Sequence, residues 1–220
     1  MHSLTPLRNE RGFSLIELLV ASVVTMVVLG GAVALTSQIQ NGYRRQLEDS
    51  AAEQEARYAL DWIGRYIRSA DHNPFTQALS ECPVAGTAVA GVQMNPDGDA
   101  EDDDIRLMTD ANPPDGYFGG TAATGCQQAH EDVTISLDEE TNTIVFLDNN
   151  TGGAVSTRTD TVIEDLNFVY RDSGRAITAN AASVFYIEIQ ITVRTRTIDV
   201  ASGQPMTRTL TSEVRLRSRT

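Results

Sequence analysis

The sequence contains no lysine, so all 17 of its basic residues are arginines, against 30 acidic residues in 220 positions. Fifteen of the acids lie between positions 71 and 140, where Arg106 is the only arginine, so this middle segment carries a charge of −14. A protein that binds nucleic acid needs a basic surface to neutralise phosphates. No basic stripe is present, and we expect no direct nucleic-acid binding.

The sequence is also poor in residues that build catalytic or zinc sites. Its three histidines, His2, His72 and His130, are far apart, and it has only two cysteines. No glycine-rich phosphate loop follows a predicted strand. Residues scattered in this way indicate neither a nucleophile with its base nor a zinc site. The sequence therefore predicts no enzymatic activity.

Charge is missing from one long stretch near the N-terminus. From Phe13 to Leu35 there are 23 residues with a single ionisable side chain, Glu17, and no proline occurs between Pro6 and Pro74. A helix of that length can cross the hydrocarbon core of a bilayer. A carboxylate in such a helix costs about 2.5 kcal/mol or more near the bilayer centre, so we expect Glu17 to have a partner.

The residues before this stretch are polar and include Arg8 and Arg11. Positive residues beside an apolar helix keep that end in the cytoplasm. A secretory signal would be followed by a small-residue cleavage site, and none stands out after Leu35. The sequence therefore predicts a single-pass membrane protein with a cytoplasmic N-terminus.

The segment Arg11–Ala21, which reads RGFSLIELLVA, resembles the prepilin signal of type IV pilins and type II secretion pseudopilins. In that family a membrane-embedded aspartic peptidase, the prepilin peptidase, cuts after the glycine and N-methylates the new terminal residue. The resemblance implies cleavage between Gly12 and Phe13 and methylation of Phe13. It also implies that Glu17, at the fifth position of the mature chain, serves assembly.

Assembly gives Glu17 a partner. Cleavage creates a positive α-amino group at the head of an apolar helix, and a neighbouring subunit shifted along the axis can place its amine against this carboxylate. Pairing the two charges offsets the cost of burying either one alone. The alternative is a plain signal anchor with a stray glutamate near its cytoplasmic end.

From position 36 to about 70 the helical pattern continues and becomes amphipathic. Its apolar stripe consists of Ile39, Tyr43, Leu47, Ala52, Ala56, Leu60, Ile63, Ile67 and Ala70. The segment 71–74, which ends in proline, then stops the helix. We predict one helix of nearly sixty residues, embedded in the membrane first and packed on a domain second.

The densest acidic segment, 95–104, reads NPDGDAEDDD. Oxygen ligands at alternating positions around a glycine turn suit a hard cation such as Ca²⁺. The segment does not follow the EF-hand pattern, and a solvated acidic loop is the alternative. If Ca²⁺ binds, the expected ligands are Asp97, Asp99, Asp102 and Asp104.

The two cysteines, Cys82 and Cys126, follow the membrane segment. A low, even count in an exported domain indicates one disulfide bond in an oxidising compartment. On the chain-entropy account this bond would stabilise the fold by about 4 kcal/mol. It would tie down a loop region at about 75–132; two unpaired buried thiols are the alternative.

After position 131 the apolar period changes to two, which is typical of an antiparallel sheet with one buried face. The pattern predicts strands at 105–108, 133–137, 143–147, 162–170, 184–194 and 210–216. Three segments, taken in their order, resemble the PilW-like minor pilins and the related J-type pseudopilins. They are VIEDLNFVY at 162–170, the long strand from Val184 and the ending VRLR at 214–217.

The resemblance implies an α+β, type IV pilin-like lollipop, in which a long N-terminal helix packs on an antiparallel β-sheet domain. Residues 1–12 would be the leader, and 13–35 the transmembrane and assembly half of the helix. Residues 36–70 would be its amphipathic half, and 71–220 the globular domain.

The implied function is that of a minor pilin subunit of a type IV pilus. The chain would sit in the bacterial inner membrane with its globular domain periplasmic, and then enter the filament or its tip. Its partners would be the prepilin peptidase, other pilin subunits contacted through the N-terminal helix, the inner-membrane assembly platform and, before assembly, membrane lipid. A type II secretion pseudopilin and a calcium-dependent tip adhesin are the alternatives. No cofactor is expected apart from this Ca²⁺.

Overall fold

The structure is a computed structural model. It describes residues 12–72, 91–99, 101–110, 129–150, 153–198 and 203–217. The described chain contains one α-helix, eight β-strands and a short 3-10 helix. It divides into two compact units, residues 1–46 and 47–220, and the long helix runs through the boundary between them.

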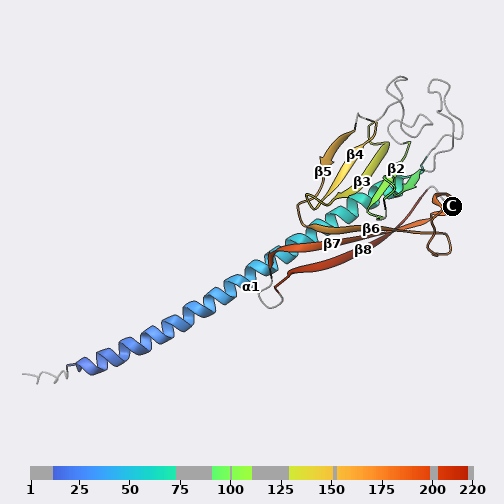
Figure 1. The fold of residues 1–220 in the computed structure, drawn as a ribbon. Helices are drawn as coiled ribbons and strands as arrows, with labels where there is room; N and C mark the ends of the chain where they lie inside the picture. The colour runs from blue at the N-terminus through green and yellow to red at the C-terminus, as the bar shows by residue number, and fades with distance from the viewer. Residues whose placement is uncertain are drawn as a thin grey trace, which may run out of the picture. The chain divides into compact units, whose positions relative to one another are not determined.

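Helix α1 begins at Leu15 and ends at Ser69 (Figure 1). It has no internal proline and continues without a break through Gly30 and Gly31. Beyond its last turn, Asp71 adopts a left-handed backbone conformation with φ of 61°, and its amide donates to the Met108 carbonyl oxygen at 2.8 Å. The chain therefore leaves the helix before Pro74, as the sequence predicts.

Two antiparallel sheets accompany the helix, where the sequence suggests one. The first has five strands paired in chain order: β1 (Val92–Met94), β2 (Asp104–Met108), β3 (Asp132–Asp138), β4 (Thr143–Asp148) and β5 (Ala154–Thr157). The second has three, also in chain order: β6 (Ile163–Arg171), β7 (Tyr186–Ile198) and β8 (Pro205–Arg215), with the 3-10 helix η1 (Ala181–Ser183) between β6 and β7. Alternation along a strand indicates its buried face, but it does not say which strand lies beside it.

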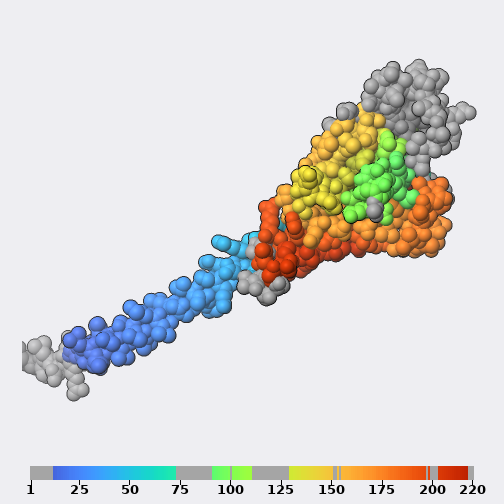
Figure 2. Space-filling view, viewed as in Figure 1, coloured from blue at the N-terminus to red at the C-terminus, as the bar shows by residue number. Residues whose placement is uncertain are grey.

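The inner faces of both sheets and the second half of α1 enclose one hydrophobic core. Its fully buried members include Ile63 and Ile67 of the helix, Ile135 and Phe146 of the first sheet, and Ile189 of the second. In the space-filling view, the strands of both sheets form one continuous body (Figure 2). The α+β class, with the long helix packed against antiparallel strands, is thus confirmed.

Close contacts join the helix to each sheet. Trp62 meets Phe146 of β4 edge to face, with ring centroids 6.4 Å apart. Gly64 faces β8, where an added Cβ would lie 3.3 Å from a methyl group of Val214. A small residue at position 64 therefore lets the helix approach this strand closely.

The buried stripe of α1 is shorter than its apolar stripe. Ile39, Tyr43 and Leu47 are 52–63% exposed, and the first buried residue of the helix is Ala52. The apolar period shows which face of a helix can be buried. It does not show how many positions of that face the domain buries.

Candidate functional site

The segment around the expected cleavage point forms the N-terminal cap of α1. Residues 12–14 are not helical, and Leu15 is the first helical residue. The Ser14 amide donates to Glu17 Oε2 at 3.0 Å, and the Ile16 amide donates to Ser14 Oγ at 3.4 Å. A serine and a glutamate placed three residues apart in this way form a capping box, which satisfies amides that the first helical turn leaves unpaired.

The capping role of Glu17 was missed at the level of the sequence. The available signal was the spacing S-x-x-E ahead of an apolar run. Glu17 also lies in the first turn, where a negative charge interacts favourably with the helix dipole. Its side chain is exposed, and within the described chain the Ser14 amide is its only hydrogen-bond partner. The carboxylate therefore caps the helix and still faces outward, where a cation from another chain can reach it.

The first half of α1 presents an apolar surface on all sides. Phe13 and Leu15 are each 88% exposed, and every residue from 13 to 35 is exposed. A helix that is apolar all round belongs in lipid or among other helices. By length and composition α1 is long and apolar enough to cross a membrane, with a mean hydropathy of 2.5 in its most apolar window.

Hydroxyl groups in this half bond to their own helix. Ser22 Oγ donates to the Leu19 carbonyl oxygen at 2.8 Å, and Thr25 Oγ1 donates to the Ala21 carbonyl oxygen at 2.7 Å. These bonds satisfy the donors without water. The helix surface therefore meets the requirement that polar groups in a bilayer be satisfied internally.

The acidic segment 95–104 connects β1 to β2 as a loop organised by its own carboxylates. Asp97 Oδ1 accepts the Asp99 amide at 3.1 Å, and Asp99 Oδ1 accepts the Glu101 amide at 2.8 Å. Asp104 Oδ2 accepts the Asp97 amide at 3.2 Å. Within the described ranges, no three His, Cys, Asp or Glu side chains are gathered into a group that could hold a metal ion. Calcium binding by this loop stays a prediction.

Two carboxyl groups of this loop are hard to ionise. Burial, together with the charges of Asp99 and Asp97, raises the pKa of Asp103 to about 6. Burial and the charge of Asp97 likewise raise the pKa of Asp104 to about 6. The loop therefore has an excess of negative charge with no compensating ion pair among the described residues.

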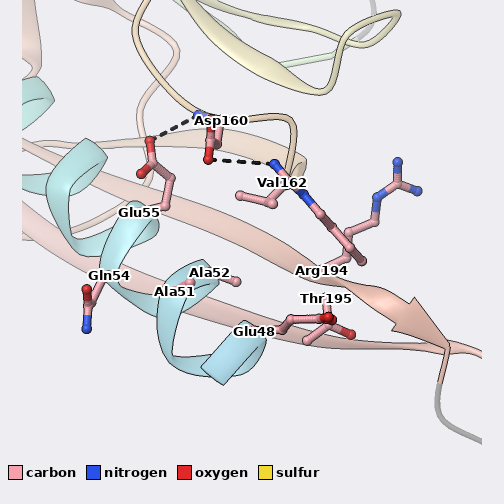
Figure 3. Close-up of a pocket in the computed structure, with 10 residues that line it drawn as sticks. Glu48, Ala51, Ala52, Gln54, Glu55, Asp160, Val162, Arg194 and Thr195 are labelled. Carbon is pink, nitrogen blue, oxygen red and sulfur yellow. Dashed lines mark hydrogen bonds and ion pairs between the residues drawn. The ribbon is translucent and has the colours of Figure 1, made fainter. Parts of the chain in front are cut away.

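A groove runs between α1 and the second sheet, with a volume of about 310 Å³ (Figure 3). Its lining consists of Glu48, Ala51, Ala52, Gln54, Glu55, Asp160, Val162, Arg194, Thr195 and Arg196. The Asp160 amide donates to Glu55 Oε1 at 3.1 Å, and Arg196 Nη2 lies 3.6 Å from Asp160 Oδ2. Glu55, Asp160 and Arg196 therefore interact with one another at one side of the groove.

The two described histidines are both exposed. The His130 ring lies 5.7 Å from that of Phe146, and its Nδ1 lies 3.4 Å from Asp148 Oδ2. The carbonyl oxygen of His72 accepts the Asp110 amide at 2.8 Å.

Cys82 and Cys126 lie outside the described residues, so their disulfide bond stays a prediction. The leader residues before Gly12 also lie outside them.

Comparison with known proteins identifies the N-terminal segment. Residues 7–33 match the family described as the prokaryotic N-terminal methylation motif, and the match includes Gly12, Phe13 and Glu17. No curated protein and no solved structure matches the chain. The match is confined to the N-terminal segment, and it shows a prepilin-type signal of the kind that prepilin peptidase processes in proteins that assemble with pilins.

Proposed function

We propose that this chain is a minor pilin of a type IV pilus, cut between Gly12 and Phe13 and methylated on Phe13. The observation that carries the proposal is the apolar half of α1, which is exposed on all sides and headed by an outward-facing Glu17. Such a surface requires lipid before assembly and neighbouring helices after it.

The bond proposed for cleavage is accessible. Gly12 and Phe13 are both exposed and precede the first helical residue, so a peptidase can bind the segment without unwinding the helix. Ser14 and Glu17 both remain on the mature side of the cut. The capping box therefore survives processing, and the mature helix keeps its defined start.

Glu17 is proposed to bind the terminal amine of a neighbouring subunit. Removal of the leader places a positive charge on Phe13, close to a carboxylate that the helix holds at its surface. In a bundle of apolar helices, water is excluded and the attraction between the two charges is stronger than in solution. A neighbour with the correct axial offset satisfies both charges, so the pair can set the register of assembly.

The proposed location follows from the same features. The helix anchors the precursor in the bacterial inner membrane with its leader cytoplasmic and its globular domain periplasmic, and an assembly platform then moves the mature subunit into the filament or its tip. A type II secretion pseudopilin would use the same N-terminal segment. Loss of surface pili in a deletion strain favours a pilin, whereas retained pili with loss of protein secretion favours the pseudopilin.

Intact-mass analysis of the chain from membranes tests the processing step. The proposal predicts a mature protein that begins at Phe13 and carries one added methyl group. Gly12→Leu, which places a bulky side chain at the cleaved bond, should accumulate with its leader, whereas Ser14→Ala should be processed normally. A mature chain that starts at another residue would contradict the proposal.

A further inference from the structure

Two buried oxygen atoms near the acidic loop have no hydrogen-bond partner. They are Oδ1 of Asp104, in a residue that is 3% exposed, and the hydroxyl oxygen of Tyr170, in a residue that is 5% exposed. Leaving a buried polar group without a partner costs about 1–3 kcal/mol. Most such groups in folded proteins are paired with protein, water or an ion. Two of them in one region therefore indicate a ligand.

The two oxygens belong to neighbouring parts of the fold. The Phe168 amide of β6 donates to the Asp102 carbonyl oxygen at 2.8 Å, which joins this strand to the end of the acidic loop. Tyr170 lies two residues further along β6, on the same buried face as Phe168. Burial raises the pKa of the Tyr170 hydroxyl, and the charges of Asp102 and Asp104 raise it further.

No positive side chain of the described chain neutralises this region. Arg106, the nearest arginine in the sequence, pairs with another carboxylate, because its Nε donates to Asp132 Oδ1 at 2.7 Å. No ion pair among the described residues involves positions 97–104. Carboxylate oxygens that no cation of the protein neutralises are ligands that a hard metal ion such as Ca²⁺ takes.

We propose that Asp102, Asp104 and Tyr170 bind one Ca²⁺ ion between the acidic loop and β6. Ca²⁺ accepts six to eight oxygen ligands and draws some of them from backbone carbonyls and water. A site with two carboxylates and one phenol agrees with the absence of any three-carboxylate group among the described residues. The proposal limits the ligands to the end of the loop that hydrogen-bonds to β6, so Asp97 and Asp99 are not among them.

The ion would connect two parts of the domain that are far apart in sequence. It would hold the end of the acidic loop against β6 and satisfy both unpaired oxygens. This role does not depend on which filament the chain enters.

Thermal unfolding of the full chain in detergent micelles tests the site. The protein is first stripped with EDTA at pH 7.5, and unfolding is followed through the fluorescence of Trp62, the only tryptophan in the sequence. At Ca²⁺ concentrations of about ten times the Kd, Tm should rise by about 3–6 °C. Sodium chloride of equal ionic strength should not reproduce this rise. A Tm that does not change up to 5 mM Ca²⁺ overturns the proposal.

Three variants assign the ligands. Asp102→Asn changes an exposed side chain, so it should fold and bind Ca²⁺ at least tenfold more weakly. Tyr170→Phe should raise Tm in EDTA, because it removes an unpaired buried hydroxyl, and it should show a smaller calcium-dependent rise. Glu139→Gln removes one exposed carboxylate from the turn between β3 and β4 and should behave like the wild type. Equal calcium-dependent rises in all four proteins would show that the ion binds elsewhere, which also overturns the proposal.

Discussion

At the scale of single residues, Glu17 combines two functions in one carboxylate. It accepts the Ser14 amide at 3.0 Å, and its side chain is exposed on an apolar helix. The resemblance to prepilins predicts its assembly role, but only the structure reveals that it also caps the helix. Because removal of the whole side chain would abolish both interactions, experiments on assembly need a variant that keeps the cap.

Gly91 occupies a position that has no room for a side chain. Its amide donates to Asp71 Oδ1 at 3.1 Å, and a Cβ at position 91 would overlap the backbone of Asp71. We predict that Gly91→Ala lowers the free energy of unfolding by about 1–3 kcal/mol, because overpacking forces the end of α1 away from β1.

Gly42→Ala provides the matched control for this prediction. Position 42 is helical and has no neighbouring atom that a Cβ would meet, so alanine should be neutral or stabilise by up to about 1 kcal/mol. Equal denaturant midpoints for the two variants would show that the Gly91 contact is not tight.

The raised pKa of Asp103 predicts that the stability of the fold depends on pH. Its pKa is raised to about 6 in the folded chain, above its ordinary value of 3.8, so between these two values the folded state binds more protons than the unfolded state. Stability from this group is therefore present at low pH and is lost as pH rises through about 6. In EDTA, Asp103→Asn should have a higher Tm than wild type at pH 7.5, and this advantage should shrink by pH 4.5.

Glu139→Gln is again the control, because Glu139 is exposed in the turn after β3. Its Tm should follow that of the wild type at both pH values. If Asp103→Asn differs from wild type by the same amount at pH 7.5 and pH 4.5, Asp103 does not titrate in this range.

At the scale of elements, helix α1 has an exposed first half and a second half that supports the core. Ile63 is fully buried, whereas Tyr58, five residues earlier, is 52% exposed. We predict that Ile63→Ala lowers the free energy of unfolding by about 2–5 kcal/mol, because it leaves a cavity in the core. Tyr58→Ala should lower it by about 0.5 kcal/mol or less in the same urea titration. Similar losses for the two variants would contradict this assignment of the buried face.

The strands differ in how well the sequence predicts them. β3, β4, β6 and β7 have apolar residues at alternate positions, and their pattern predicts them within a few residues. β1 has only three residues, and β5 has four, with Val155 65% exposed. Neither strand has a buried alternating face long enough to be recognised, because each lies at an edge of its sheet.

The start of β8 also differs from the position that the sequence predicts. The sequence predicts a strand at 210–216, whereas β8 begins at Pro205 and pairs with β7 along its length. Its first residues are exposed or half-buried, so they have no buried apolar alternation. Pairing with the long strand β7 extends β8 beyond the part that the core requires.

At the scale of the whole molecule, the apolar segment that is proposed to enter the membrane and the filament is separate from the folded core. The apolar part of α1 lies in the unit 1–46, and the core of both sheets lies in the unit 47–220. The methylation motif is confined to residues 7–33. The motif therefore identifies how the N-terminal segment is processed, and it does not extend to the strands of the folded unit.

The most direct test of assembly compares Glu17→Gln, Glu17→Ala and Ser14→Ala by the amount of each in sheared filaments, relative to its processed pool in the membrane. The amide side chain of the Glu17→Gln variant keeps an oxygen that can accept the Ser14 amide but has no charge, whereas Ser14→Ala weakens the cap and keeps the charge. All three should lose their leader after Gly12. If charge pairing drives assembly, both Glu17 variants should be incorporated at least tenfold less than wild type, and Ser14→Ala should be incorporated normally. Normal incorporation of Glu17→Gln would contradict the account.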